Sequence, residues 1–337
     1  MSTPRTVPFD PRPLVEPVDP AAARAFTREL RATGQMPSSG GNVIGAVLLG
    51  VFGLFFVSIF LTVGGGFISM FVSQLGRPLS WALLPMMLMA VLICGGVVVV
   101  IVFLIRNIGV THVRRYRLHR FARANGMSYL PVLDNPPLPG MIFSVGSSRT
   151  SADLVRGEHP RFVEFANYSF ETGSGKETTT HRWGYVAVKL NTPLPHIVLD
   201  ALSNNGLFGA SNLPASFDKG QRLSLEGDFD RYFALYCPRG YERDALYLFT
   251  PDIMARFIDN AAALDVEIVD DWLFLYAQRN FATLDPATWA WLFSVVGALL
   301  DKLAQWERWR DERMRPAMDA AAPAAGAAAA AAELPFA

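Results

Sequence analysis

The pattern of apolar and charged positions sets one part of the chain apart. Between residues 41 and 105 the only charged side chain is Arg77, which separates two long apolar runs. A helix needs about 20 apolar residues to cross the hydrocarbon core of a bilayer, and both runs exceed that length. Lipid admits only segments whose backbone is hydrogen-bonded internally. The pattern therefore predicts a transmembrane helical hairpin over residues 41–106.

The arginines predict how this hairpin is oriented. They flank both runs, whereas the connecting loop has one, Arg77. The flanking arginines are Arg5, Arg12, Arg24, Arg28, Arg31, Arg106, Arg114, Arg115, Arg117, Arg120 and Arg123. The positive-inside rule then places both termini in the cytoplasm, as in a multi-pass plasma-membrane protein with two spans. Neither run holds an ionisable side chain, so we interpret the hairpin as an anchor rather than an ion pathway.

The polar segments on either side of the hairpin are each expected to contain one helix. Residues 1–40 are predicted to be a cytoplasmic tail, disordered to residue 18, with a short helix between the Asp19-Pro20 cap and Gly34. Residues 107–126 are predicted to be a basic stem helix that ends at Gly126. Its arginines lie at headgroup level if the hairpin spans the membrane, and anionic lipid is an expected partner there.

Residues 127–315 have the pattern of a folded cytoplasmic domain. Aromatic and β-branched runs at 161–172 and 178–190 surround a Gly-Ser-Gly-Lys turn, which predicts a β-hairpin. Further strands are predicted at 127–133, 194–201, 221–228 and 231–238, a helix from Thr250-Pro251, and a second hairpin turning at Asp270-Asp271. This order predicts an α+β fold with a mostly antiparallel sheet of seven or eight strands and covering helices.

A last helix is predicted to begin at Asp285-Pro286. The apolar run that follows, residues 287–300, is too short to span a bilayer. We expect it to pack on the sheet, with a position at the membrane surface as the alternative. Residues 316–337 are rich in alanine and are predicted to be a disordered tail.

The charge balance and the cysteine content narrow the range of expected partners and cellular compartments. The chain has 30 basic and 30 acidic residues, so its formal net charge of zero gives no indication of a nucleic-acid partner. The two cysteines are Cys94, inside the second apolar run, and Cys237, in an apolar strand. They cannot form a disulfide framework, in agreement with a reducing cytoplasm, and Cys237 is expected to be a buried structural thiol.

The candidate site residues are few. Thr172 to Lys176 resemble part of a phosphate-binding loop but lack its first glycine and its final hydroxyl, so they are interpreted as a turn. His196 and Asp200 share a strand face, with a loop directly after them. The ligand-binding candidates are His196, Asp200, Asn204, Asn205, His181 and Arg182. No nucleophile or metal set accompanies them, so we expect no metal and no cofactor.

One stretch has a familiar order of elements. Residues 229–276 contain a strand, an acidic turn, a Leu-Phe-Thr-Pro helix start at Leu248–Pro251, a helix and a strand hairpin. The stretch resembles the core of a domain of unknown function found at the C-terminus of bacterial two-span membrane proteins. The resemblance implies the same membrane topology and brings no catalytic residues.

These observations lead to three hypotheses. The first is a membrane-anchored cytoplasmic binding or scaffold protein, with the lipid bilayer, other proteins or itself as partners, and we consider it more plausible than an enzyme. The second is a membrane-tethered, hydrolase-like enzyme with its site near His196 and Asp200. The third is an oligomeric membrane-organising protein that packs through glycine-containing helix faces such as Gly41 and Gly45 and through its last amphipathic helix.

Overall fold

The computed structural model describes residues 8–36, 65–73, 95, 110–205, 211–214, 221–224, 229–258, 264–305 and 308. The chain forms two compact units, Pro17–Arg117 and a second made of Met1–Glu16 with Leu118–Ala337. We call them the helical unit and the sheet unit, and each is described by itself. Of the predicted hairpin at 41–106, only α4 (Gly65–Ser73) and residue 95 are described, both helical. The rest of the hairpin, and the predicted tail at 316–337, lie outside the described residues.

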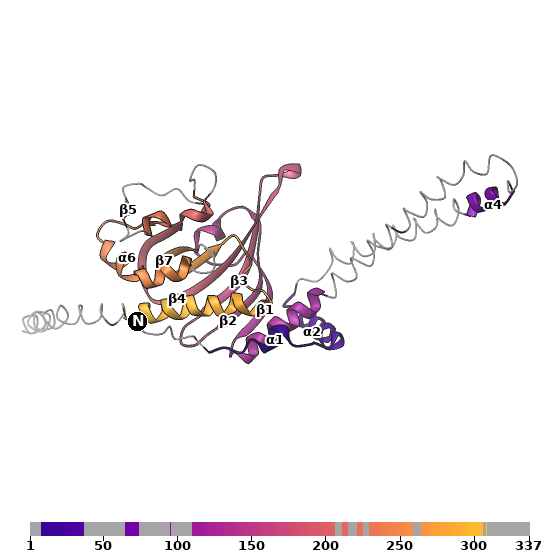
Figure 1. The fold of residues 1–337 in the computed structure, drawn as a ribbon, viewed down its shortest axis with the longest axis horizontal. Coiled ribbons are helices and arrows are strands. Elements are labelled where there is room, and N and C mark those ends of the chain that lie inside the picture. Colours follow the sequence, from indigo (N-terminus) through magenta and orange to yellow (C-terminus); the bar gives the residue numbers. More distant parts are fainter. Residues whose placement is uncertain are drawn as a thin grey trace, which may run out of the picture. The chain divides into compact units, whose positions relative to one another are not determined.

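The sheet unit is built on one antiparallel sheet, which confirms the predicted α+β class (Figure 1). Its seven strands follow the order β1-β2-β3-β4-β6-β5, and β7 pairs with β4 outside this path. The strands are β1 (Ser128–Asp134), β2 (Ser147–Gly157), β3 (Val163–Thr172), β4 (Thr179–Ala201), β5 (Arg222–Leu223), β6 (Phe233–Tyr236) and β7 (Asp265–Ala277). The predicted β3–β4 hairpin is confirmed, with Gly173 and Gly175 at positive φ in its turn.

Two strands are longer than predicted, because each runs through a position where the sequence pattern predicts a break. β4 runs without interruption through both predicted strands at 178–190 and 194–201. β7 does the same, so the predicted hairpin at Asp270-Asp271 is wrong. Asp270 instead has a φ of 51° at an irregularity where it pairs with Leu194. Because β4 shifts register at the same place, it gives both halves of β7 a partner, and these halves pair with β4 rather than with each other.

Several shorter elements complete the sheet unit. β2 and α6 (Glu242–Leu248) are present in the structure but were not predicted from the sequence. α7 (Pro251–Ile258) begins at the predicted Thr250-Pro251. Of the predicted strand at 221–228, the structure describes only the first half, which contains β5. Cys237 is a buried free thiol, as expected.

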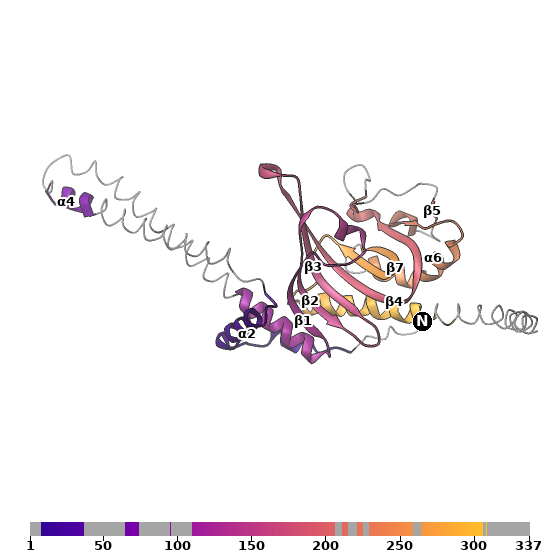
Figure 2. The same cartoon turned by 180° about the vertical axis from the view of Figure 1, so that it is seen from behind.

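The C-terminal helix (Pro286–Gln305) covers one face of the sheet, as Figures 1 and 2 show from opposite sides. Its start is capped by Asp285, whose carboxylate accepts hydrogen bonds from the N–H groups of Ala287 and Thr288. It is the one helix in the described part of the chain that is long and apolar enough to cross a membrane. Its apolar stripe is nevertheless buried inside the unit, where Trp289 meets Phe165 of β3 at 5.5 Å between ring centroids. The predicted packing on the sheet is therefore confirmed.

The opposite face of the sheet carries an aromatic layer. At its centre is Phe143 of the 3₁₀ helix η3 (Met141–Ser144). The Phe143 ring lies 4.8 Å from Tyr168 on β3, 5.0 Å from Tyr185 on β4 and 5.6 Å from Phe274 on β7. All these rings are buried, so η3 covers this face of the sheet, while the C-terminal helix covers the other.

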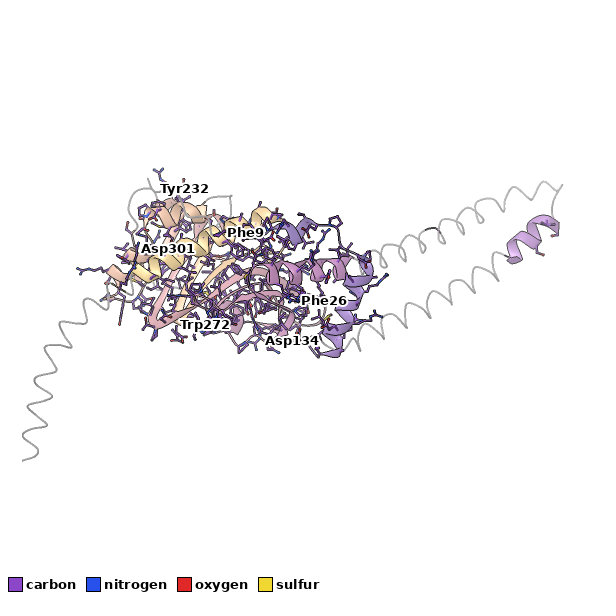
Figure 3. The ribbon with its side chains drawn as sticks, turned by 90° about the horizontal axis from the view of Figure 1, so that it is seen from below. Phe9, Phe26, Asp134, Tyr232, Trp272 and Asp301 are labelled. Carbon is purple, nitrogen blue, oxygen red and sulfur yellow. The ribbon has the colours of Figure 1, made fainter. Side chains whose placement is uncertain are left out.

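The N-terminal segment belongs to the sheet unit, and the predicted disorder of residues 1–18 is wrong from residue 8 onward. Asp10 and Asn125 exchange two hydrogen bonds, at 2.6 and 3.1 Å. The Phe9 ring, whose residue is labelled in Figure 3, lies 5.1 Å from the Phe293 ring of the C-terminal helix. In α1 (Arg12–Val15), Leu14 is fully buried. Scattered apolar residues that lack a helical or strand period thus find partners supplied by distant parts of the chain.

The described part of the helical unit is largely as predicted. α2 (Pro20–Ala32) is capped by Asp19, which accepts from the N–H of Ala21 at 2.9 Å, and Gly34 follows it at a φ of 71°. Residues 110–124 form the stem helix, of which 110–117 belong to this unit. Phe26 of α2 packs on Tyr116 of the stem at 5.6 Å between ring centroids.

Gly184 on β4 tests how tightly the sheet and the segment before the C-terminal helix are packed. A Cβ at this position would clash with the carbonyl oxygen of Arg279 and lie 2.5 Å from Cγ of Phe281. Gly184→Ala is therefore expected to destabilise the sheet unit by about 1–3 kcal/mol. Thermal unfolding of the full-length protein in nanodiscs would measure it. Gly157→Ala is the matched control, because its Cβ would meet only the Met127 side chain at ordinary distance; equal effects of the two variants would contradict the packing.

Candidate functional site

Two buried carboxylates meet where β4 ends and β7 begins. Asp200 and Asp265 are 2% and 0% exposed. The backbone N–H of Ala201 donates to Oδ1 of Asp265 at 2.8 Å. The side-chain amides of Asn204 and Asn212 donate to its Oδ2 at 3.0 and 3.3 Å. The loop after β4 thus turns its polar side chains inward, onto a carboxylate of a different strand.

Asp200 is held by the same loop. It accepts hydrogen bonds from Nδ2 of Asn205 at 3.3 Å and from Oγ of Ser211 at 3.1 Å. Oδ1 of Asn205 in turn accepts from the N–H of Asn212 at 3.2 Å. We call this set the acidic cluster: Asp200, Asp265, Asn204, Asn205, Ser211 and Asn212. The structure therefore brings three of the six candidate residues together, around a carboxylate that was not among the candidates.

Burial dominates the electrostatics of the acidic cluster. It raises the pKa of Asp265 to about 7, with a further contribution from the charge of Asp200, and the hydrogen bonds from Ala201 and the two asparagines oppose it. Burial also raises the pKa of Asp200, against the hydrogen bonds from Asn205 and Ser211. The cluster consequently holds a proton at pH values where an ordinary aspartic acid is ionised.

A third buried carboxylate, Glu267, lies two residues further along β7. Its Oε2 accepts from the backbone N–H of Met141 and from the Tyr276 hydroxyl, both at 2.8 Å. Its Oε1 lies 2.9 Å from Nε2 of His196. The Glu267 side chain is 2% exposed and that of His196 is 51% exposed, so a buried carboxylate contacts a histidine that solvent can reach. The hydrogen bond to Glu267 raises the pKa of His196 against the opposing effect of burial.

Glu267→Gln tests this pairing. The variant is expected to lower the pKa of His196, because the attraction of the carboxylate charge is lost and the effect of burial remains. Mass-spectrometric measurement of hydrogen exchange at the histidine C2 position gives the pKa of each of the five histidines in the full-length chain. The four other histidines are internal controls. An unchanged His196 pKa would contradict the pairing.

The two remaining candidates, His181 and Arg182, lie near the other end of β4. Nε2 of His181 lies 2.8 Å from Oγ1 of Thr172, and its ring stacks on Phe170 at 4.8 Å. Arg182 pairs with Ser169 across the hairpin and is exposed. These contacts are those of an ordinary strand pair, so the structure does not bring His181 or Arg182 into the acidic cluster.

An apolar cleft of about 690 Å³ opens elsewhere in the sheet unit. Its walls are the N-terminal segment, the end of the stem helix, the segment after β2 and the C-terminal helix. The apolar lining includes Phe9, Val163, Phe165, Phe293, Val296 and Leu300. The polar lining includes Asp10, Arg12, Asn125, His159 and Arg161. A volume of this size with a mainly apolar wall and a few polar groups is typical of small-molecule sites.

The described residues offer limited chemistry. Among them, no three histidine, cysteine or carboxylate side chains lie close enough together to hold a metal ion. Within the same part of the chain, the His196 ring contacts the carboxylate of Glu267 and not a serine, threonine or cysteine side chain. Hydrolysis by a nucleophile and a base needs such a contact or its equivalent.

The sequence did not reveal Asp265, Glu267 or the apolar cleft. One signal was present, since Asp265 and Glu267 alternate with apolar residues in β7 and therefore share a face. Their partners come from β4, from its following loop and from η3, far away in the sequence. The cleft could not be inferred, because one wall is the segment that was predicted to be disordered.

The fold and these contacts define an α+β protein with a seven-stranded antiparallel sheet, one long covering helix and an apolar cleft. No family model and no curated protein matches the sequence. A structure that is similar to this one is the crystal structure of the mycobacterial trehalose monomycolate transport factor A, TtfA. The similarity covers 56% of this chain and 93% of that chain, with 12% sequence identity and a TM-score of 0.37. At that level the similarity says nothing about the function of this chain.

Proposed function

We propose that this protein is a membrane-anchored binding module whose sheet unit binds a small molecule with an apolar body and an anionic group. The observation that carries the proposal is the apolar cleft of about 690 Å³. Residues 41–106 would anchor the module in the plasma membrane as two spans with both termini in the cytoplasm. The resemblance to bacterial two-span proteins with a C-terminal domain of unknown function favours the same anchoring.

The cleft lining favours a ligand of this kind. The Phe9 and Phe293 rings are only partly buried, so a ligand that covers them gains roughly 25 cal/mol for each Å² of apolar surface removed from water. Arg12 and Arg161 add guanidinium groups, which are suited to carboxylate and phosphate oxygens. Asp10 binds Arg12 through two hydrogen bonds, at 2.9 and 2.8 Å, and thereby fixes its orientation.

The hydrolase-like alternative has less support. His196 and Asp200 do not line this cleft, and each is engaged by other side chains. An oligomeric membrane-organising role would depend on Gly41 and Gly45, which lie outside the described part of the chain, and on the last helix, whose apolar stripe is buried against the sheet. We therefore keep the binding module as the proposal.

Photocrosslinking tests the proposed ligand site. The probe is a fatty acid with a diazirine in mid-chain, added to the full-length protein in nanodiscs, with crosslinked peptides mapped by mass spectrometry. We expect crosslinks in residues 157–165 and 293–300, which form two walls of the cleft. Crosslinks confined to residues 41–106 would report contact with bulk lipid only and would overturn the proposal.

A matched pair of variants sharpens this test. Gly297 lines the cleft, whereas Ala290 on the same helix is exposed and does not. Gly297→Phe should fill the cleft and reduce crosslinking there several-fold, and Ala290→Phe should leave it unchanged. Leu300→Gln provides a second variant of the lining in case the bulky side chain disturbs the helix. Equal crosslinking in all variants would count against the site.

A further inference from the structure

A second pocket lies within the helical unit. It has a volume of about 390 Å³ and is formed by one face of α2 together with a histidine of the stem helix. The lining residues are Ala21, Arg24, Thr27, Arg28, Arg31 and His112. The three arginines follow one another at helical spacing, so their side chains share one face of α2.

The pocket has an excess of positive charge. The described residues of the helical unit contain six arginines and only two carboxylates, Asp19 and Glu29. Neither carboxylate lines the pocket, and Asp19 is engaged in capping α2. The exposed guanidinium groups of Arg24, Arg28 and Arg31 form no ion pair with any described residue. Three arginine side chains that line one pocket, with no acid among the lining residues, supply planar donor groups of the kind that bind the oxygens of a phosphate group.

His112 has a defined place in this arrangement. Its Nδ1 lies 3.0 Å from Oγ1 of Thr27, whose hydroxyl donates to the carbonyl oxygen of Ala23 at 3.0 Å. Since that hydroxyl has one proton, the proton between the two side chains must come from Nδ1 of His112. Nε2 is therefore the nitrogen that gains a proton when the ring becomes charged. Burial together with Arg31, Arg115 and Arg24 lowers the pKa of His112 and disfavours the charged ring.

We propose that α2 and the stem helix form a binding site for a phosphate group, held by Arg24, Arg28 and Arg31 beside His112. A phospholipid headgroup and a soluble phosphate ester share this chemistry. The stem helix follows the predicted second span, which favours the headgroup. A bound phosphate offsets the charge of Arg24 and Arg31, so the pKa of His112 rises when the site is filled. This inference does not rest on the apolar cleft, and the two are tested by different measurements.

The test uses the full-length protein in phosphatidylcholine nanodiscs, with histidine C2 hydrogen exchange as the readout. One arm contains added phosphatidic acid, and a second contains soluble glycerol phosphate at millimolar concentration. We expect the pKa of His112 to rise with the phosphate group, while those of His159, His181 and His196 stay unchanged. A rise with phosphatidic acid alone assigns the site to lipid, and a rise in both arms assigns it to phosphate esters in general. No rise in either arm overturns the proposal.

Two triple variants distinguish a specific phosphate site from non-specific attraction to a positively charged surface. Arg24→Gln, Arg28→Gln and Arg31→Gln together should abolish the His112 response and weaken phosphatidic-acid binding by on the order of tenfold or more, since the hydrogen bonds between charged groups are lost. Arg114→Gln, Arg117→Gln and Arg123→Gln remove the same charge outside the pocket and should keep the response. Equal loss in both triple variants would overturn the proposal. The single Arg28→Lys variant tests geometry if the triple variants fail to fold, because it keeps the charge and should still weaken binding.

Discussion

Replacing Trp289 by alanine is expected to lower the free energy of unfolding of the sheet unit by about 3–5 kcal/mol. The Trp289 side chain is fully buried between the C-terminal helix and the sheet. Its ring lies 4.6 Å from Phe121 and 5.5 Å from Phe165. Its Nε1–H donates to the carbonyl oxygen of Thr283 at 2.8 Å, so the substitution leaves both a cavity and an unpaired acceptor.

Native-state hydrogen exchange of the full-length protein, read by mass spectrometry on β3 and β4 peptides, measures this loss. Trp272→Ala is the matched control. Trp272 is also a tryptophan of the sheet unit, but it is only partly buried, and we expect a clearly smaller loss of stability. If the two variants opened β3 and β4 at the same free energy, the C-terminal helix could not be the main cover of that face.

Asp265→Asn is expected to remove a pH dependence of stability and to stabilise the sheet unit at pH 8. The pKa of Asp265 is about 7 in the folded chain, compared with about 4 in the unfolded chain. Between these values the folded state binds the additional proton, so wild-type stability falls as pH rises from about 4 to 7. The change amounts to roughly 1.4 kcal/mol for each unit of difference between the two pKa values. Asparagine carries no charge and cannot contribute this slope.

The neighbouring side chains can accommodate the amide. The Oδ1 atoms of Asn204 and Asn212 are buried without a hydrogen-bond partner in the described structure. If these two amides turn over, they can accept from the new side-chain NH₂, while the new carbonyl oxygen accepts from the N–H of Ala201.

Denaturant unfolding of wild type and variant between pH 4 and 8 gives the difference directly. Asp285→Asn is the control of opposite sign. Hydrogen bonds from Thr288 and Ala287 lower the pKa of Asp285, so its contribution to stability is present above its unfolded pKa and is lost as pH falls. An Asp265→Asn curve parallel to that of wild type would show that Asp265 does not hold the proton.

The sequence predicted those parts of the fold that depend on neighbouring residues. The caps at Asp19, Thr250 and Asp285 marked helix starts, and the turn at Gly173 to Gly175 marked the long hairpin, because these signals act within a few residues. β2 was missed because its first half, Ser-Ser-Arg-Thr-Ser, is polar and becomes a strand only by pairing with both β1 and β3. Its pattern reflects a position in the sheet rather than an intrinsic preference.

The candidate site was predictable to a smaller extent. The face shared by His196 and Asp200 follows from the two-residue period of a strand. Their partners Glu267 and Asp265 depend on the register between β4 and β7, which is set by the shared irregularity near Leu194 and Asp270. A local pattern contains no information about that register, so the hairpin prediction at Asp270-Asp271 failed for the same reason.

The N-terminal segment has a consequence for synthesis. Phe9 packs in the sheet unit, yet its partner Phe293 is made about 280 residues later. At about 5–20 residues per second, Phe9 waits on the order of 15–60 s before this partner exists. The sheet unit is thus completed only after Phe293 has been made, by a segment that was synthesised well before it.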